Sequence, residues 1–283
     1  MSADAPWAYD ATVGETAWGR LERAHVHLIV KVAAAPRVPG HAYAVPWEGR
    51  QMTEPRGVIL DLDGLLIDSE QWAWEAHNAV LSGYTLPALA LDEVQQLVGL
   101  QGDDEWRAFT AIRPLPDLAR EEYGRRVRDA FIGLRAARLA PQPGVGELLA
   151  AVCTLDLRLG LASNSSLASI EAALEGLGIA DRFMAVASGL EPERGKPDPA
   201  VYLLALDRLG LRPDEAIAVE DSQAGLRAAL AAGLYCVVVP GPITAALDLG
   251  AAHRRFDDLH GVAAWLPAFV ATRRAVSCDR REV

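Results

Sequence analysis

Residues 61–64, with the sequence DLDG, constrain the fold of this chain more than any other stretch. They follow the apolar residues Gly57-Val58-Ile59-Leu60, whose composition predicts a short buried strand. Because side chains two residues apart in an extended backbone point to the same side, Asp61 and Asp63 share one face at the strand's carboxyl end. Two carboxylates so close together repel each other unless a cation lies between them. The stretch therefore predicts a cation-binding strand end, or more simply an acidic turn.

The chain from residue 141 onward predicts an α/β fold. Short apolar runs alternate there with longer stretches of helical periodicity, which is typical of a doubly wound parallel sheet covered by helices on both faces. Strands are expected at 157–162, 183–188, 215–219 and 234–239. Helices are expected at 144–153, from about 167 to 176, at 198–209, at 223–232 and near 257–265.

Residues 70–138 have helical patterns and need no strand, with helices expected at 71–81, 92–97, 103–110 and 117–137. We therefore expect a helical cap domain at 70–138, inserted into a core domain made of 52–69 and 139–270. Residues 1–51 are expected to be a loosely ordered N-terminal extension, or alternatively a small appended lobe. Residues 271–283 are expected to be a frayed C-terminal tail.

Composition limits the functional classes. The chain of 283 residues is 51% hydrophobic and carries a net charge of −11, which argues against nucleic acid or an anionic membrane as a partner. No apolar run approaches the roughly 20 residues of a membrane span. The three cysteines (Cys153, Cys236 and Cys278) are far apart, which favours reduced thiols in a cytoplasmic protein over disulfides or a zinc site. The sequence indicates no protein partner.

Polar residues follow each of the first four predicted strands of the core. Asp61 and Asp63 follow the first strand; Ser163 and Asn164 follow the second; Lys196 lies in the loop after the third; Glu220 and Asp221 end the fourth. Because the carboxyl ends of parallel strands meet at one edge of the sheet, all of them are expected to converge there. Lys196 is also one of only two lysines among 27 basic residues, which favours a need for a compact ammonium group.

The types of these residues fit the chemistry of a phosphate ester. Asp61, Asp63, Glu220 and Asp221 would form an all-oxygen anionic cluster that suits Mg²⁺. Lys196 and the Ser163 hydroxyl can hold phosphate oxygens, and Asn164 is expected beside them in substrate binding. One carboxylate can attack phosphorus while a second, two residues on, transfers the proton of the leaving alcohol and then activates water.

Four sequence motifs, DLDGLLIDS, LASNSS, GKPDP and VEDSQAGLRAALAAG, resemble in order those of the haloacid dehalogenase superfamily, and in particular its β-phosphoglucomutase-like and sugar-phosphatase branch. The resemblance covers about residues 57–239. It implies a Rossmann-like core with a mobile helical cap, Asp61 as nucleophile and Asp63 as general acid/base. It also implies that Ser163 and Lys196 hold the phosphoryl group, and that Asp61, the Asp63 carbonyl, Glu220 and Asp221 place Mg²⁺.

Two departures from the family pattern favour a phosphatase over a mutase. The position at which mutases carry a histidine is Ala73, and residues 99–102 lack the arginine that holds a second phosphate. We therefore expect a Mg²⁺-dependent phosphatase that acts on a small phosphorylated metabolite, such as a sugar or polyol phosphate, through an aspartyl-phosphate. The alternatives are a phosphomutase and a catalytically silent phosphate-binding module. Trp72 is a candidate for binding substrate in the cap, although packing in the cap core is the more common role of such a residue.

Overall fold

The computed structural model describes residues 52–98, 100, 102–115 and 120–279. The expectations for residues 1–51 lie outside the described residues. No helix within the described ranges combines the length and the apolar character that crossing a membrane requires.

The described core is built on a six-stranded sheet in the order β3-β2-β1-β4-β5-β6, and every neighbouring pair is parallel. Its strands are β1 (Gly57–Leu60), β2 (Arg158–Ser163), β3 (Ala185–Ser188), β4 (Ala216–Glu220), β5 (Tyr235–Val238) and β6 (Arg254–Arg255). The predicted doubly wound fold is confirmed. Leu60 at the end of β1 is opposite Leu161 of β2 and Val219 of β4, so these three strands end at the same edge.

Helices cover both faces of the sheet, which explains why its central strand β1 is apolar and fully buried. On one face, Val58 and Leu60 pack with α6 (Val145–Thr154), α7 (Leu167–Gly176) and α10 (Leu259–Asp279). On the other, Ile59 packs with α8 (Ala200–Leu209) and α9 (Gln223–Ala231). The short 3₁₀ helices η3 (Ala180–Arg182) and η4 (Pro213–Glu215) precede β3 and β4.

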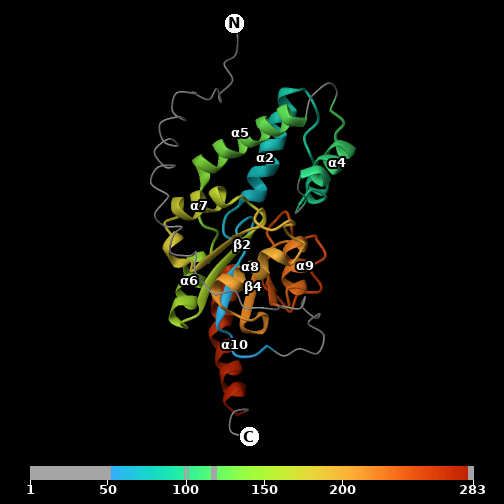
Figure 1. The fold of residues 1–283 in the computed structure, drawn as a ribbon. Helices are drawn as coiled ribbons and strands as arrows, with labels where there is room; N and C mark the ends of the chain where they lie inside the picture. Colours follow the sequence, from blue (N-terminus) through green and yellow to red (C-terminus); the bar gives the residue numbers. More distant parts are fainter. Residues whose placement is uncertain (1–51, 99, 101, 116–119, 280–283) are drawn as a thin grey trace. The chain divides into compact units, whose positions relative to one another are not determined.

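The segment between β1 and α6 consists of helices, as predicted for the cap. Its elements are α2 (Ser69–Gly83), α3 (Leu91–Gln95), α4 (Gly102–Ile112) and α5 (Arg120–Arg138). Helices α2 and α5 lie side by side (Figure 1). Leu81, Phe109 and Tyr123 centre a separate apolar cluster among these helices. The Arg135 side chain on α5 donates a hydrogen bond of 2.8 Å to Ser169 Oγ on α7 of the core.

The C-terminal part of the described chain differs from the expectation. In place of a short helix near 257–265 followed by a frayed tail, α10 continues to Asp279. The extra turns are held because Val270 is fully buried and because Arg274 Nε donates to Glu54 Oε1 at 3.1 Å. Strand β6 was not expected; its two residues, Arg254 and Arg255, are exposed and are defined by pairing with β5.

Candidate active site

The loop after β1 brings two of the predicted acids to the sheet edge. Gly64 adopts φ +79°, a left-handed conformation that favours glycine, and its N–H donates to Ile67 O at 2.9 Å. A Cβ at this position would lie 2.2 Å from Asp221 Oδ2. A glycine directly after Asp63 therefore permits both the turn and the close approach of Asp221 to the end of β1.

Lys196 joins the ends of three strands. Its Nζ donates to Asp61 Oδ1 at 2.5 Å, to Glu220 Oε1 at 2.6 Å and to Ala162 O at 2.7 Å. Burial by itself lowers the pKa of Lys196, but the charges of Asp61 and Glu220 outweigh that effect and raise this pKa above its usual value. The ammonium group is therefore charged and neutralises part of the buried carboxylate cluster.

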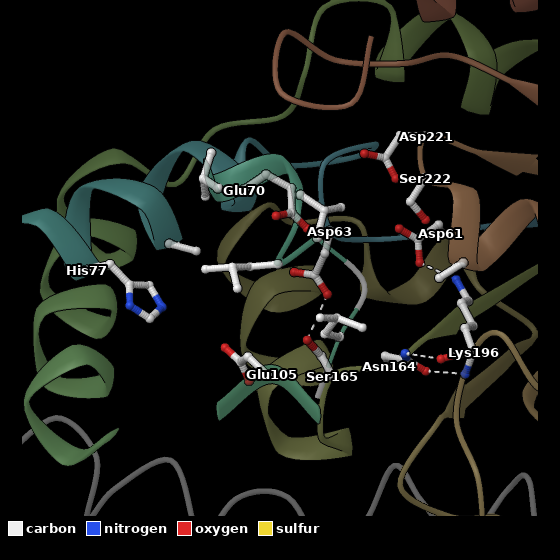
Figure 2. A pocket seen from close by; sticks show the side chains of 16 residues that line it. Asp61, Asp63, Glu70, His77, Glu105, Asn164, Ser165, Lys196, Asp221 and Ser222 are labelled. Atoms are coloured by element: carbon white, nitrogen blue, oxygen red, sulfur yellow. Dashed lines mark hydrogen bonds and ion pairs between the residues drawn. The ribbon is translucent and has the colours of Figure 1, made fainter. Parts of the chain in front are cut away.

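Asn164 is oriented toward Lys196. Its Oδ1 accepts from the Lys196 backbone N–H at 2.7 Å, and its Nδ2 donates to the Lys196 carbonyl at 3.1 Å, as Figure 2 shows. The side chain also lines the adjoining pocket. Besides the expected place near the substrate, Asn164 thus holds the loop that carries Lys196, a role that the sequence did not suggest.

Asp63 is held by two serines, one at the end of β2 and one just after it. Its Oδ2 accepts hydrogen bonds from Ser163 Oγ at 2.9 Å and from Ser165 Oγ at 2.7 Å. Ser163 is fully buried, whereas Ser165 lines the pocket. Ser165 was not among the predicted site residues, although it belongs to the same serine-rich LASNSS motif. Both hydroxyls orient Asp63 from the side of the neighbouring strand.

Glu220 is the most deeply enclosed of the acids. In addition to Lys196, its Oε1 accepts from Tyr202 OH at 2.5 Å, and Ser222 Oγ lies 3.3 Å from Oε2. A Cβ on Gly225 would lie 1.9 Å from Oε2, so only glycine at that position of α9 leaves room for this carboxylate. Tyr202 was missed from the sequence because it occupies an ordinary core-facing position on α8.

Three carboxylates could hold a metal ion together. Oxygens of Asp61, Glu220 and Asp221 all lie within 4.8 Å of one another. Burial raises the pKa of both Asp61 and Asp221 well above the usual value, and the neighbouring carboxylates raise it further. A hard divalent cation would relieve this repulsion, and an all-oxygen donor set is the kind that Mg²⁺ prefers. The residues present therefore fit such an ion.

A pocket of about 330 Å³ opens from these groups toward the cap helices (Figure 2). Its lining includes Asp61, Asp63, Lys196 and Asp221 from the core. The cap contributes three titratable side chains that the sequence reasoning did not single out, namely Glu70, His77 and Glu105. Glu70 and His77 are seven residues apart on α2, a spacing that places both on one face of a helix and could have identified them.

Burial shifts the pKa values of these three cap side chains. It raises the pKa of Glu70 to about 7, with a further contribution from the charge of Asp63, and raises the pKa of Glu105. It lowers the pKa of His77 to about 4, so this imidazole is neutral at pH 7. His77 Nδ1 is hydrogen-bonded to Tyr123 OH at 2.8 Å.

Trp72 does not take the place predicted for it in the substrate pocket. It is 4% exposed and packs in the core cluster shared with the sheet, with its ring centroid 6.4 Å from that of Phe131. It is not among the described residues that line the pocket. The expected substrate role is therefore corrected to packing, because this position on α2 faces the core while Ala73 and His77 face the cavity.

We expect the raised pKa of Glu70 to appear in the pH dependence of stability. The pKa of Glu70 is about 7 in the folded protein, compared with an ordinary value of 4.5. Its contribution to stability is therefore fully present below pH 4.5 and is lost as the pH rises through about 7. Without added metal, Glu70→Gln should therefore gain stability over the unmodified protein as the pH rises from about 5 to 8, reaching about 1–3 kcal/mol. Urea unfolding at a series of pH values measures the difference. A pH-independent difference would contradict the assignment.

Comparisons with known proteins identify a family and several relatives of this chain. A family model for haloacid dehalogenase-like hydrolases matches residues 58–239. Hexitol phosphatase B from Escherichia coli (strain K12) is 34% identical over 194 residues, covering 68% of this chain and 87% of that protein. Phosphoglycolate phosphatase from Rhodospirillum rubrum is 34% identical over 223 residues, covering 75% of this chain and 91% of that protein. Among solved structures, a variant of CbbY from Rhodobacter sphaeroides in complex with xylulose-(1,5)bisphosphate has a TM-score of 0.64 and 29% identity, covering 73% of this chain and 95% of that one.

Proposed function

This chain belongs to the haloacid dehalogenase-like hydrolases, and we propose that it is a Mg²⁺-dependent phosphatase that hydrolyses a small phosphorylated metabolite, such as a sugar or polyol phosphate. The observation that carries the proposal is the arrangement of Lys196 between Asp61 and Glu220, with Asp221 beside them and Asp63 lining the same pocket. It combines a nucleophile, a candidate metal site and a fixed cation in one cavity. The similarity to named phosphatases supports the same activity.

The metal site of the proposed enzyme would use Asp61, the backbone carbonyl of Asp63 and Asp221. Glu220 is within reach of the same site, but its Oε1 already accepts hydrogen bonds from Lys196 and Tyr202. We therefore assign Glu220 first to holding Lys196 and second to the charge of the metal site. When bound, Mg²⁺ would supply charge neutralisation and polarisation of the phosphate group.

The protein side chains carry the proposed reaction in two steps. A carboxylate oxygen of Asp61 attacks phosphorus, the bond to the leaving oxygen breaks, and Asp63 donates a proton from Oδ1 to that oxygen, which gives an alcohol and an aspartyl-phosphate. Asp63 then takes a proton from water as the water oxygen attacks phosphorus, which releases inorganic phosphate and restores Asp61. The bonds from Ser163 and Ser165 to Oδ2 support this role because they leave Oδ1 for the proton.

Lys196 would stabilise the phosphoryl oxygens during transfer, because a buried ammonium beside the nucleophile interacts strongly with developing negative charge. The absence of an arginine from residues 99–102, and Ala73 at the position of the mutase histidine, favour hydrolysis over mutase chemistry.

Phosphate release from a panel of sugar and polyol phosphates, measured with and without a chelator, tests the proposal. We expect release from at least one ester, a loss of about 100-fold or more in chelator, and recovery on addition of Mg²⁺. Far-UV circular dichroism in chelator should remain unchanged, which separates loss of the metal from loss of the fold. Unchanged phosphate release after complete metal removal would contradict the metal dependence. Failure to release phosphate from every ester of the panel would contradict the phosphatase assignment.

A further inference from the structure

The pocket has a second half, on the cap side, whose chemistry differs from that of the core side. Glu70, Ala73 and His77 line it from one face of α2, and Glu105 lines it from α4. Figure 2 shows the side chains of Glu70, His77 and Glu105 around the same cavity as Asp63 and Ser165. A substrate whose phosphoryl group lies beside Asp61 would therefore extend its leaving group between α2 and α4.

The polar groups of this cap half suit hydroxyl groups. Neither Glu70 nor Glu105 has a hydrogen bond from another described residue; burial and nearby charges alone shift the pKa of each. An ionised carboxylate can accept hydrogen bonds from several hydroxyl groups. Because His77 Nδ1 is bonded to Tyr123 OH, Nε2 is the ring nitrogen that is left for a ligand. Two acceptors and one neutral imidazole form a set that a polyhydroxylated leaving group can satisfy.

The ionisable side chains of the cap half that can carry a charge near pH 7 are acidic, namely Glu70 and Glu105. Among the described residues that line the pocket, Lys196 is the only cation, and it is engaged by Asp61 and Glu220 at the core end. Like charges brought within a few ångströms in a partly buried cavity repel strongly. A second phosphate or a carboxylate placed beside Glu70 and Glu105 would meet no other cation among the described residues that line this pocket, because Arg120 and Arg128 line only the neighbouring cavity.

The space available for a leaving group continues beyond the first pocket into a second cavity. A neighbouring cavity of about 560 Å³ between α4 and α5 shares Ala73, His77 and Glu105 with it. Because the side chain of Ala73 is a single methyl group, it fills little of the space where the two cavities meet. A leaving group of the size of a hexose or a hexitol can therefore be accommodated.

We propose that Glu70, His77 and Glu105 form a leaving-group subsite that selects phosphomonoesters of neutral sugars or polyols and disfavours leaving groups that carry a second phosphate or a carboxylate. The proposal rests on the proposed phosphatase function. It assigns to Glu70 and Glu105 a selection by charge that the catalytic groups do not provide, and to His77 the role of a neutral hydrogen-bonding group.

The experiment compares kcat/KM for a hexitol monophosphate, the matching hexitol bisphosphate and phosphoglycolate. We expect the unmodified protein to prefer the monophosphate by about tenfold or more over each anionic competitor. Glu105→Gln, which keeps the size and removes the charge, should reduce that preference by about tenfold, and Glu70→Gln should shift it in the same direction. Asp129→Asn, a matched change at an exposed position of α5, should leave the preference unchanged.

The possible failures are distinguishable. If the protein releases phosphate but shows the same preference in Glu105→Gln and Glu70→Gln as in Asp129→Asn, the subsite is wrong while the phosphatase function stands. A preference for the bisphosphate in the unmodified protein would also overturn the subsite, and would indicate that Arg120 or Arg128 of the neighbouring cavity takes the distal phosphate. If the protein releases phosphate from none of the esters, the proposed function is wrong and this inference fails with it.

Discussion

Replacement of Asp61 by asparagine is expected to lower kcat by about 10⁴-fold or more while the protein remains folded. An amide of the same shape cannot attack phosphorus, so the aspartyl-phosphate cannot form. The fold should tolerate the change because the carbonyl oxygen of the introduced amide can still accept the hydrogen bond that Lys196 Nζ donates to Asp61 Oδ1. Steady-state phosphate release and a thermal melt measure the two quantities separately.

The matched control for this substitution is Asp207→Asn, which makes the same chemical change at an exposed position of α8. It should retain full turnover. Turnover of the Asp61→Asn protein within about tenfold of the unmodified protein would remove Asp61 from the role of nucleophile. Loss of the folded state in that variant would instead assign Asp61 a structural role.

Replacement of Lys196 by methionine is expected to have the largest effect on stability. It would leave Asp61 and Glu220 buried without their cation, and removal of one partner from a buried ion pair costs about 3–5 kcal/mol. Turnover should also fall by about 10³-fold, because the cation beside the nucleophile no longer stabilises the transferring phosphoryl group. Urea unfolding and phosphate release measure the two effects.

The stability loss in Lys196→Met should depend on pH in a defined direction. The ammonium of Lys196 lowers the pKa of Asp61, and without it burial and the charge of Glu220 raise this pKa further. The variant therefore binds more protons when folded than the unmodified protein does, so its stability deficit should grow as the pH rises from about 5 to 8. Arg182→Met, at an exposed cation, provides the control. A Lys196→Met protein as stable as that control at every pH would show that Lys196 does not hold the cluster together.

The arrangement of Asp61, Lys196, Glu220 and Asp221 was predictable from local patterns because it depends on a general property of the fold. Apolar runs alternating with helical segments predict parallel strands, and parallel strands deliver whatever follows them to the same edge. The order of the strands was not needed for that conclusion. The resemblance of the four motifs to those of the haloacid dehalogenase superfamily is likewise confirmed by the family match over residues 58–239.

Hydrogen-bond partners inside the site were less accessible to sequence reasoning. Tyr202 contacts Glu220, 18 positions away in the chain, and Ser165 contacts Asp63, 102 positions away. Helical periodicity identifies the buried face of α8 but does not distinguish a tyrosine that bonds a carboxylate from one that only packs. The orientation of Trp72 toward the core likewise depends on how α2 lies against the sheet and α5.

The chain's sequence alone determined its fold class, its helical insertion and the set of acids, hydroxyls and lysine that meet at the sheet edge, because these depend on short-range periodicity and on the order of motifs. Only the tertiary structure decided which cap side chains face that edge and which bonds hold Lys196 and Asp63. Those features depend on the rotation and packing of helices against one another, and packing is a property of surfaces distant in the chain that no local pattern encodes.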